Sequence, residues 1–151
     1  MSQEELKTKI TELLPSAMFE ESSEFLQLIL DAPDLLPLMK QLRFDTQTDF
    51  DYLFNLTCVD WKDHMMMVYH LFSKTLKHTL VVKAKISDRE HPEIESLSEI
   101  WKTAELQERE VFDLFGVTFL HHPDLRRLFM EEDWKGFPLR KDYTDENMIE
   151  L

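Results

Sequence analysis

The chain has 151 residues, the size of one domain and enough to bury a hydrophobic core. Its formal net charge of -13 argues against a nucleic-acid-binding protein, which needs a basic face to meet phosphates. The single cysteine, Cys58, excludes an intrachain disulfide and cannot hold an iron-sulfur cluster alone; its apolar surroundings predict a buried, inert thiol in a reducing compartment.

The first fifty residues predict two helices and a strand pair. Apolar side chains at helical spacing follow Ser2 and stop at Pro15. A strand is expected at 25–31, with 17–20 as its partner, and a second helix at 34–42. The polar amino terminus is not expected to be a signal peptide, and no apolar stretch is long enough to cross a bilayer. Membrane association is therefore expected only through another polypeptide.

Residues 50–86 predict a strand meander. Segments 52–61, 64–73 and 79–86 are rich in Val, Leu, Thr and aromatic residues, and short polar breaks separate them. Side chains alternate along a strand, so Met65, Met66 and Met67 cannot all point inward. We expect these methionines to fill the core rather than to form a sulfur ligand site or a soft contact surface.

After Pro92 a helical period returns. Apolar residues at three- and four-residue steps predict a helix, and Gly116 is expected to end it in a left-handed conformation. The apolar residues are Ile94, Leu97, Trp101, Ala104, Val111 and Phe115. No glycine precedes position 116, which excludes a dinucleotide fingerprint and a P-loop. The elements together predict an α/β body at residues 1–118.

The remaining residues, 119–151, form the C-terminal arm, which has neither helical nor strand period. The arm is nearly neutral before its acidic end, and it is rich in aromatic residues and arginine, whereas the body is acidic. Such a composition is typical of a surface that is buried against another protein. The arm is therefore predicted to dock on a partner chain through Arg126, Arg127, Phe129, Trp134, Phe137, Arg140, Lys141 and Tyr143.

Charged residues crowd the end of the last predicted helix, namely Glu108, Arg109, Glu110 and Asp113. Arg126 and Arg127 follow where the chain could fold back, and the planar fork of arginine suits fixed pairing with carboxylates. We expect these groups to form an internal clamp at the root of the arm rather than a solvated helix face. A stand-alone acid-base enzyme using Glu108, Glu110 and His122 is the alternative from another functional class.

Adjacent histidines, His121 and His122, lack the additional ligand spacing of a metal site. His122 precedes Pro123, which favours an extended residue and a turn there.

Three blocks carry a resemblance to a known family: EREVFDLFGVTF at 108–119, HPDLRRL at 122–128 and DWKGFPLRKDY at 133–143. In their order and spacing they resemble NuoC, the family of the 30 kDa subunit of the proton-pumping NADH:quinone oxidoreductase (respiratory complex I). Asp60-Trp61, Tyr69-His70-Leu71 and the segment 96–101 also match. Two positions differ, because His121 stands where the family commonly has glycine and Lys102 replaces a common proline.

The resemblance implies an α/β (α+β) fold in which a mixed sheet with a strand meander is packed by helices and followed by an extended arm. It implies a structural component that packs on the quinone-site subunit of the complex, the D subunit, and binds no cofactor itself. NADH, FMN, iron-sulfur clusters and quinone would bind partner subunits of a machine that couples electron transfer from NADH to quinone to proton translocation. The expected location is peripheral, on the cytoplasmic side of a bacterial cell membrane, as a polypeptide separate from the quinone-site subunit.

Related subunits occur in membrane-bound hydrogenases and in quinone reductases that are fed by ferredoxin or a deazaflavin. Because the electron donor binds other subunits, the sequence leaves these alternatives open.

Overall fold

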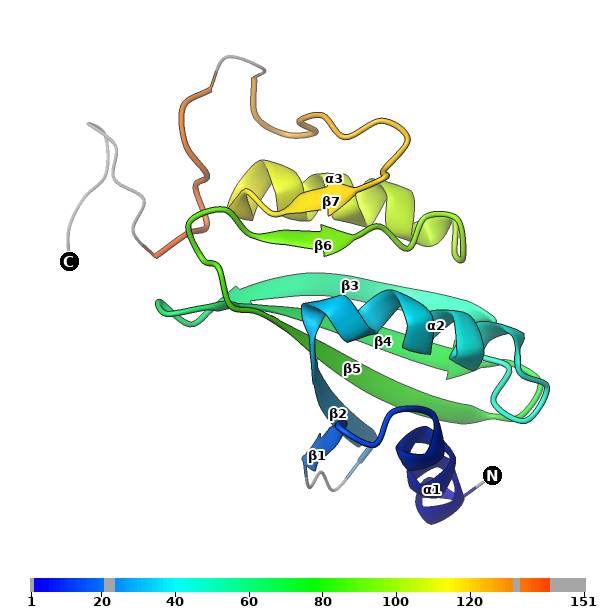
Figure 1. Cartoon of the computed structure of the whole chain (residues 1–151). Coiled ribbons are helices and arrows are strands. Elements are labelled where there is room, and N and C mark those ends of the chain that lie inside the picture. Colours follow the sequence, from blue (N-terminus) through cyan, green and yellow to red (C-terminus); the bar gives the residue numbers. More distant parts are fainter. Residues whose placement is uncertain (1, 21–23, 132–133, 142–151) are drawn as a thin grey trace.

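A five-stranded mixed sheet forms the centre of the computed structural model, which describes residues 2–20, 24–131 and 134–141 (Figure 1). The strand order is β1-β2-β5-β4-β3, and β2 and β5 are parallel while the other neighbours are antiparallel. The strands are β1 (Met18–Glu20), β2 (Leu26–Asp31), β3 (Tyr52–Asp60), β4 (Met65–Ser73) and β5 (His78–Ile86). The predicted meander and the mixed α/β class are confirmed.

Three α-helices and one short 3-10 helix, η1, accompany this sheet: α1 (Gln3–Leu13), η1 (Ala32–Asp34), α2 (Leu35–Phe44) and α3 (Thr103–Phe115). Ser2 caps α1, since its side-chain oxygen accepts a hydrogen bond from the Glu5 N–H at 3.2 Å. Gly116 ends α3 with φ 78°, as predicted. Within the described ranges, no helix has the length and apolar character to cross a bilayer.

A second, two-stranded parallel sheet contains β6 (Glu93–Glu95) and β7 (Thr118–Leu120). The prediction of a helix from Ile94 onward was wrong for residues 94–102. Ile94 and Leu97 face the core from a strand and a turn, and the Trp101 ring nitrogen donates to the Phe50 carbonyl at 3.0 Å. The three- and four-residue spacing of these apolar residues therefore reflects their burial in the core and not a helix, which begins only at Thr103.

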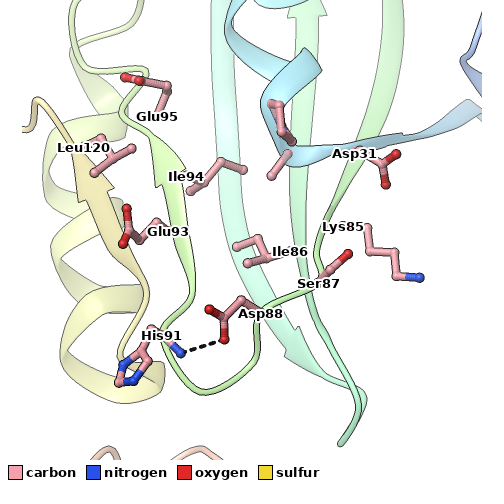
Figure 2. A pocket seen from close by; sticks show the side chains of 12 residues that line it. Asp31, Lys85, Ile86, Ser87, Asp88, His91, Glu93, Ile94, Glu95 and Leu120 are labelled. Atoms are coloured by element: carbon pink, nitrogen blue, oxygen red, sulfur yellow. Dashed lines mark hydrogen bonds between the residues drawn. The ribbon is translucent and has the colours of Figure 1, made fainter.

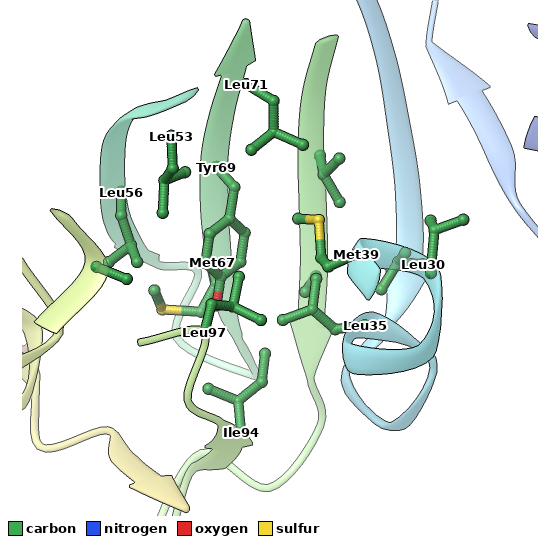
Figure 3. Close-up of a cluster of buried hydrophobic side chains, with 14 of the residues drawn as sticks. Leu30, Leu35, Met39, Leu53, Leu56, Met67, Tyr69, Leu71, Ile94 and Leu97 are labelled. Atoms are coloured by element: carbon green, nitrogen blue, oxygen red, sulfur yellow. The ribbon is translucent and has the colours of Figure 1, made fainter. Parts of the chain in front are cut away.

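The core lies between one face of the large sheet and the layer formed by α2, β6 and α3 (Figures 1 and 3). Figure 3 shows Tyr69 and Met67 of β4 facing Leu97 and Ile94, with Leu35 of α2 beside them. Met65 and Met67 are fully buried while Met66 is only partly buried, which confirms core filling on an alternating strand.

Cys58 is buried as predicted, and burial raises the pKa of its thiol to about 12, with a smaller contribution from the nearby Asp60 carboxylate. The thiolate that would attack an electrophile or bind a metal is therefore strongly disfavoured.

The first residues of the arm pack with the body. Thr118–Leu120 pair with β6, and Phe119 is among the largest fully buried side chains. The expected boundary at residue 118 thus falls within β7, and the part of the arm that leaves the core begins after this strand.

Candidate functional site

Asp113, on the last turn of α3, is the centre of the arm's root. Its Oδ2 atom accepts hydrogen bonds from three successive backbone N–H groups, those of Leu128 (3.1 Å), Phe129 (2.6 Å) and Met130 (3.0 Å). Burial disfavours the charged carboxylate, but these donors and Arg127 outweigh burial, and the pKa of Asp113 is lowered. One carboxylate therefore fixes the direction of the chain as it enters the exposed part of the arm.

Two arginines reinforce this contact between α3 and the arm. Arg127 donates to Asp113 Oδ1 at 3.2 Å and to the Gly136 carbonyl at 2.8 Å. Arg109, on α3, donates to the carbonyl oxygens of Arg126 and Arg127, both at 3.1 Å. Because each guanidinium bridges two points, segments 126–130 and 136 are held on the same helix.

Phe137 covers the end of α3. A Cβ atom added to Gly116 would lie only 2.6 Å from Phe137 Cδ2, so the ring rests directly on the glycine. The guanidinium carbons of Arg127 and Arg140 lie 5.0 and 5.4 Å from the centroid of the Phe137 ring. Glycine is thus required here for space as well as for its positive φ.

The arm also supplies donors to the unpaired carbonyls at the helix terminus. The Leu139 N–H donates to the Leu114 carbonyl at 2.9 Å, and Arg140 Nε donates to the Phe115 carbonyl at 2.6 Å. The last carbonyl groups of a helix have no partner within the helix itself. The arm therefore acts as the C-terminal cap of α3.

Asp60, at the end of β3, holds the far end of the described arm. Arg89 donates to both of its carboxylate oxygens, at 2.8 and 2.6 Å, and the Lys141 N–H donates to Oδ2 at 2.8 Å. The pKa of Asp60 lies well below its usual range, mainly because of the Arg89 hydrogen bonds, although burial opposes them. Sequence reasoning did not select Asp60 for this role; the available signal was a carboxylate on the inward-facing side of β3, in line with Leu56 and Cys58.

The residues predicted to dock on a partner divide into three groups. Arg127, Phe137 and Arg140 contact their own chain, as described above. By contrast, Phe129 is 64% exposed and Trp134 is 37% exposed, and Leu139 beside them is 53% exposed.

The remaining predicted docking residues lie at the surface or beyond the described ranges. Arg126 pairs with Asp124 at 3.0 Å on the surface, and the Lys141 ammonium lies 6.0 Å from the centroid of the Trp61 ring. Tyr143 lies outside the described residues.

The four residues of the expected clamp also differ in their surroundings. Asp113 and Arg109 contact the arm, whereas Glu110 is exposed. Glu108 faces the opposite way and is fully buried, where it accepts hydrogen bonds from the Ser96 hydroxyl (2.6 Å) and the Leu97 N–H (2.8 Å). Burial raises the pKa of Glu108 to about 7, and those two hydrogen bonds only partly oppose it.

The residues of the alternative acid-base enzyme do not share an open site. His122 Nε2 lies 3.9 Å from Glu108 Oε1, and neither side chain is accessible to solvent. The His122 ring donates from Nε2 to the Glu105 carbonyl at 2.8 Å and accepts at Nδ1 from the Asp124 N–H at 3.0 Å, so both nitrogens serve the turn. Glu110 lies apart from both residues, on the exposed side of α3.

His121 adopts φ 67°, the left-handed region that favours glycine, and its Nδ1 lies 2.8 Å from Glu95 Oε2. His121 therefore adopts the left-handed backbone conformation that a glycine at this position would favour. Among the described residues, no three His, Cys, Asp or Glu side chains are grouped to hold a metal ion.

Comparison with known proteins identifies relatives over most of the chain. The family model described as respiratory-chain NADH dehydrogenase, 30 Kd subunit, matches residues 28–147. The C subunit of the NADH-quinone oxidoreductase of Moorella thermoacetica is 40% identical over 137 residues, covering 89% of this chain and 90% of that protein. A chain of the archaeal membrane-bound sulfane sulfur reductase, a respiratory membrane complex, superposes with a TM-score of 0.76 at 29% identity, covering 93% of this chain and 85% of that chain.

Other relatives are longer. The C/D subunit of the NADH-quinone oxidoreductase of Phocaeicola vulgatus is 48% identical over 96 residues, which cover 63% of this chain but only 18% of that protein. The chain thus spans about a fifth of the length of the C/D relatives that it matches. From the extent of the family match and the similarity to the full-length Moorella protein, this chain belongs to the family of the 30 kDa subunit of respiratory-chain NADH dehydrogenase.

Proposed function

We propose that the chain is a cofactor-free structural component of a membrane-bound NADH:quinone oxidoreductase and that its C-terminal arm docks on the quinone-site subunit. One observation carries this proposal: the exposed side chains of Phe129, Trp134 and Leu139 lie on a backbone that is held at both ends by buried carboxylates. Asp113 fixes the near end and Asp60 fixes the far end. An irregular segment with apolar side chains outside and its polar contacts inside is suited to binding rather than to folding alone.

The fixed backbone lowers the entropic cost of binding. A loop that is already ordered loses less conformational freedom when a partner covers it, so more of the contact energy appears as affinity. Aromatic anchors commonly dominate the affinity of such interfaces. The names of the C/D relatives join two subunits in one polypeptide, which supports the quinone-site D subunit as the neighbour that receives the arm.

The residue chemistry supports the absence of a resident redox group. The chain has one cysteine, and an iron-sulfur cluster needs several thiolate or imidazole ligands. NADH, FMN, iron-sulfur clusters and quinone would accordingly bind partner subunits. The chain would associate with the membrane through those partners, peripherally and on the cytoplasmic side, while the assembled complex couples electron transfer to proton translocation.

Truncation of the arm tests this assignment. A chain that ends after Leu125 keeps β7 and the His122 turn but lacks both exposed aromatic anchors. We expect the truncated chain to retain a cooperative unfolding transition and to be absent from the complex purified through a tag on the quinone-site subunit. Normal co-purification of the truncated, folded chain would refute the docking role.

A second candidate is the equivalent subunit of a related complex with another electron donor, such as a membrane-bound hydrogenase or a ferredoxin- or deazaflavin-dependent quinone reductase. The similarity to a chain of the archaeal sulfane sulfur reductase complex favours considering it. Deletion of the gene should abolish NADH:quinone reductase activity in isolated membranes under the first assignment. Unchanged NADH activity, with loss of hydrogen- or ferredoxin-dependent reduction, would favour the second.

A further inference from the structure

A groove of about 730 Å³ separates β6 from the C-terminal ends of β2 and β5. Figure 2 shows Asp31 and Lys85 on one side of this groove and Glu93 and Leu120 on the other. Its lining combines apolar side chains with charged ones, and apart from Leu120 of β7 the lining residues lie on β6 or on the side of β6 that faces away from β7. The groove shares no residue with the Asp113 and Asp60 contacts that hold the exposed part of the C-terminal arm.

One wall of the groove is an unpaired strand edge. The Thr118 N–H donates to the Pro92 carbonyl and the Ser96 N–H donates to the Leu120 carbonyl, both at 2.9 Å, so these groups of the 92–96 segment face β7. Backbone groups of successive residues point to opposite edges of a strand. The N–H and carbonyl groups of Glu93 and Glu95 therefore face away from β7, and the sheet of the described residues has no further strand on that side.

The charge of the groove is negative. Four carboxylates line it, those of Asp31, Asp88, Glu93 and Glu95, against Lys85 and His91. Asp31, Asp88 and Glu93 are exposed, and Ile86 and Ile94 supply apolar surface below them. Such a groove attracts cationic side chains and can also bury an apolar one.

We propose that this groove receives an extended, basic segment of a partner subunit, which adds to β6 as the third strand of the small sheet. Main-chain hydrogen bonds to Glu93 and Glu95 would supply affinity, and Lys or Arg side chains of the bound segment would pair with the carboxylates that line the groove. Residues 142–151 do not suit the site, because they contain four Asp or Glu and no Lys or Arg. Charge complementarity thus selects another polypeptide.

This inference depends on the chain being part of a multisubunit complex but not on the docking role of the arm. Hydrogen exchange of the Glu93 and Glu95 amides, measured by mass spectrometry, tests the added strand directly. The measurement compares the isolated full chain with the complex purified through a tag on another subunit. We expect rapid exchange in the isolated chain and exchange slowed by about 100-fold or more in the complex. Unchanged exchange of both amides on assembly would overturn the proposal.

Glu93→Pro is the matched structural test. Proline removes an N–H that faces the groove, and the outward position on an edge strand tolerates it without loss of the Thr118 to Pro92 hydrogen bond. We expect the Glu95 amide to lose its protection in a complex that the arm still holds together. Glu93→Thr, which retains the N–H and the strand preference, should keep that protection, and an equal loss in both variants would contradict strand addition.

A separate cross-linking experiment tests whether the segment bound in the groove is basic. A photoactivatable benzoylphenylalanine in place of Ser87, an exposed residue of the groove lining, should cross-link a partner peptide that contains Lys or Arg. The combined Asp31→Asn and Asp88→Asn substitutions should reduce that cross-link by about tenfold or more. A cross-linked peptide without basic residues, or one from residues 142–151 of this chain, would refute the assignment.

Discussion

Glu108 and Asp113 lie on the same helix, yet their carboxylates have pKa values displaced in opposite directions. Both side chains are buried. Asp113 accepts three backbone hydrogen bonds and faces Arg127, which together favour its charged form, whereas Glu108 accepts two hydrogen bonds and has no cation within hydrogen-bonding distance among the described residues. Burial therefore keeps Glu108 protonated, because two hydrogen bonds only partly oppose it, whereas three backbone donors and Arg127 outweigh burial at Asp113 and keep that carboxylate ionised.

Asp113→Asn should release the root of the arm. Asparagine has only one acceptor oxygen and a donor NH2 group in place of the other, so it cannot accept from both the three N–H groups and Arg127, and Arg127 loses its counter-charge. We expect a loss of about 2 kcal/mol in the stability of this local structure. Hydrogen exchange at residues 128–130 should accelerate accordingly, while Glu110→Gln, on the exposed side of the same helix, should leave it unchanged.

The pH dependence of Asp113 follows from the direction of its pKa shift. A lowered pKa in the folded state means that its stabilisation is present above the unfolded value and is lost as the pH falls through the folded value. The accelerated exchange at residues 128–130, expressed relative to the intrinsic rate of an unstructured chain at the same pH, should therefore appear in the unmodified chain only on strong acidification. Acceleration already at pH 6 would contradict this role.

Glu108 should make stability fall as the pH rises from about 4.5 to about 7. In this window the folded state retains a proton that the unfolded state releases, so rising pH favours unfolding, by on the order of 3 kcal/mol in total. Urea unfolding of the wild-type chain and of Glu108→Gln, compared at several pH values, measures the difference. A difference that stays constant across this window would contradict the buried, titrating carboxylate.

At the scale of elements, the end of α3 and the arm form one unit. Gly116 turns the chain, Phe137 covers the glycine, and Arg140 caps the helix carbonyls. The glycine and its left-handed role were predictable, because one of only two glycines in the chain ends a helical period. The contact of Phe137 with Gly116 was not predictable from the sequence, because local periodicity does not relate two positions so far apart along the chain.

Gly116→Ala tests this unit. The positive φ costs an alanine about 1–2 kcal/mol, and its Cβ would also displace the Phe137 ring. In a Phe137→Ala background only the backbone cost should remain, so the two substitutions should be non-additive in the free energy of unfolding. Strictly additive losses would show that the ring does not rest on the glycine in solution.

Other elements show where periodicity fails as a guide. The strands β3 to β5 were predictable, because their alternation and short polar breaks are local features. Strand β6 was not, since Ile94, Leu97 and Trp101 have helical spacing but reach the core from a strand and a turn. Asp60 was missed as an arm contact because its partners, Arg89 and the Lys141 N–H, are distant in sequence.

At the scale of the whole molecule, a well-packed body carries an irregular arm whose polar groups bind inward and whose large apolar side chains face outward. The arm contacts the body at α3 and at the end of β3, and Phe129 and Trp134 remain exposed between these contacts. A partner surface that covers these two rings would complete the structure. Membership of the 30 kDa subunit family supports such a partner within the complex.

The affinity of the chain for the proposed partner, the quinone-site subunit, measured with the wild-type protein and with the Phe129→Ala, Trp134→Ala double variant, tests this account most directly. Each exposed anchor should contribute about 2 kcal/mol, so Kd should rise by about 30-fold for each single substitution and by about 700-fold for the double variant if the two contributions add, while the melting temperature of the isolated chain stays unchanged. Phe44→Ala, which removes a similarly exposed ring from α2, serves as the control. An unchanged Kd in the folded double variant would contradict the claim that the arm is the docking surface.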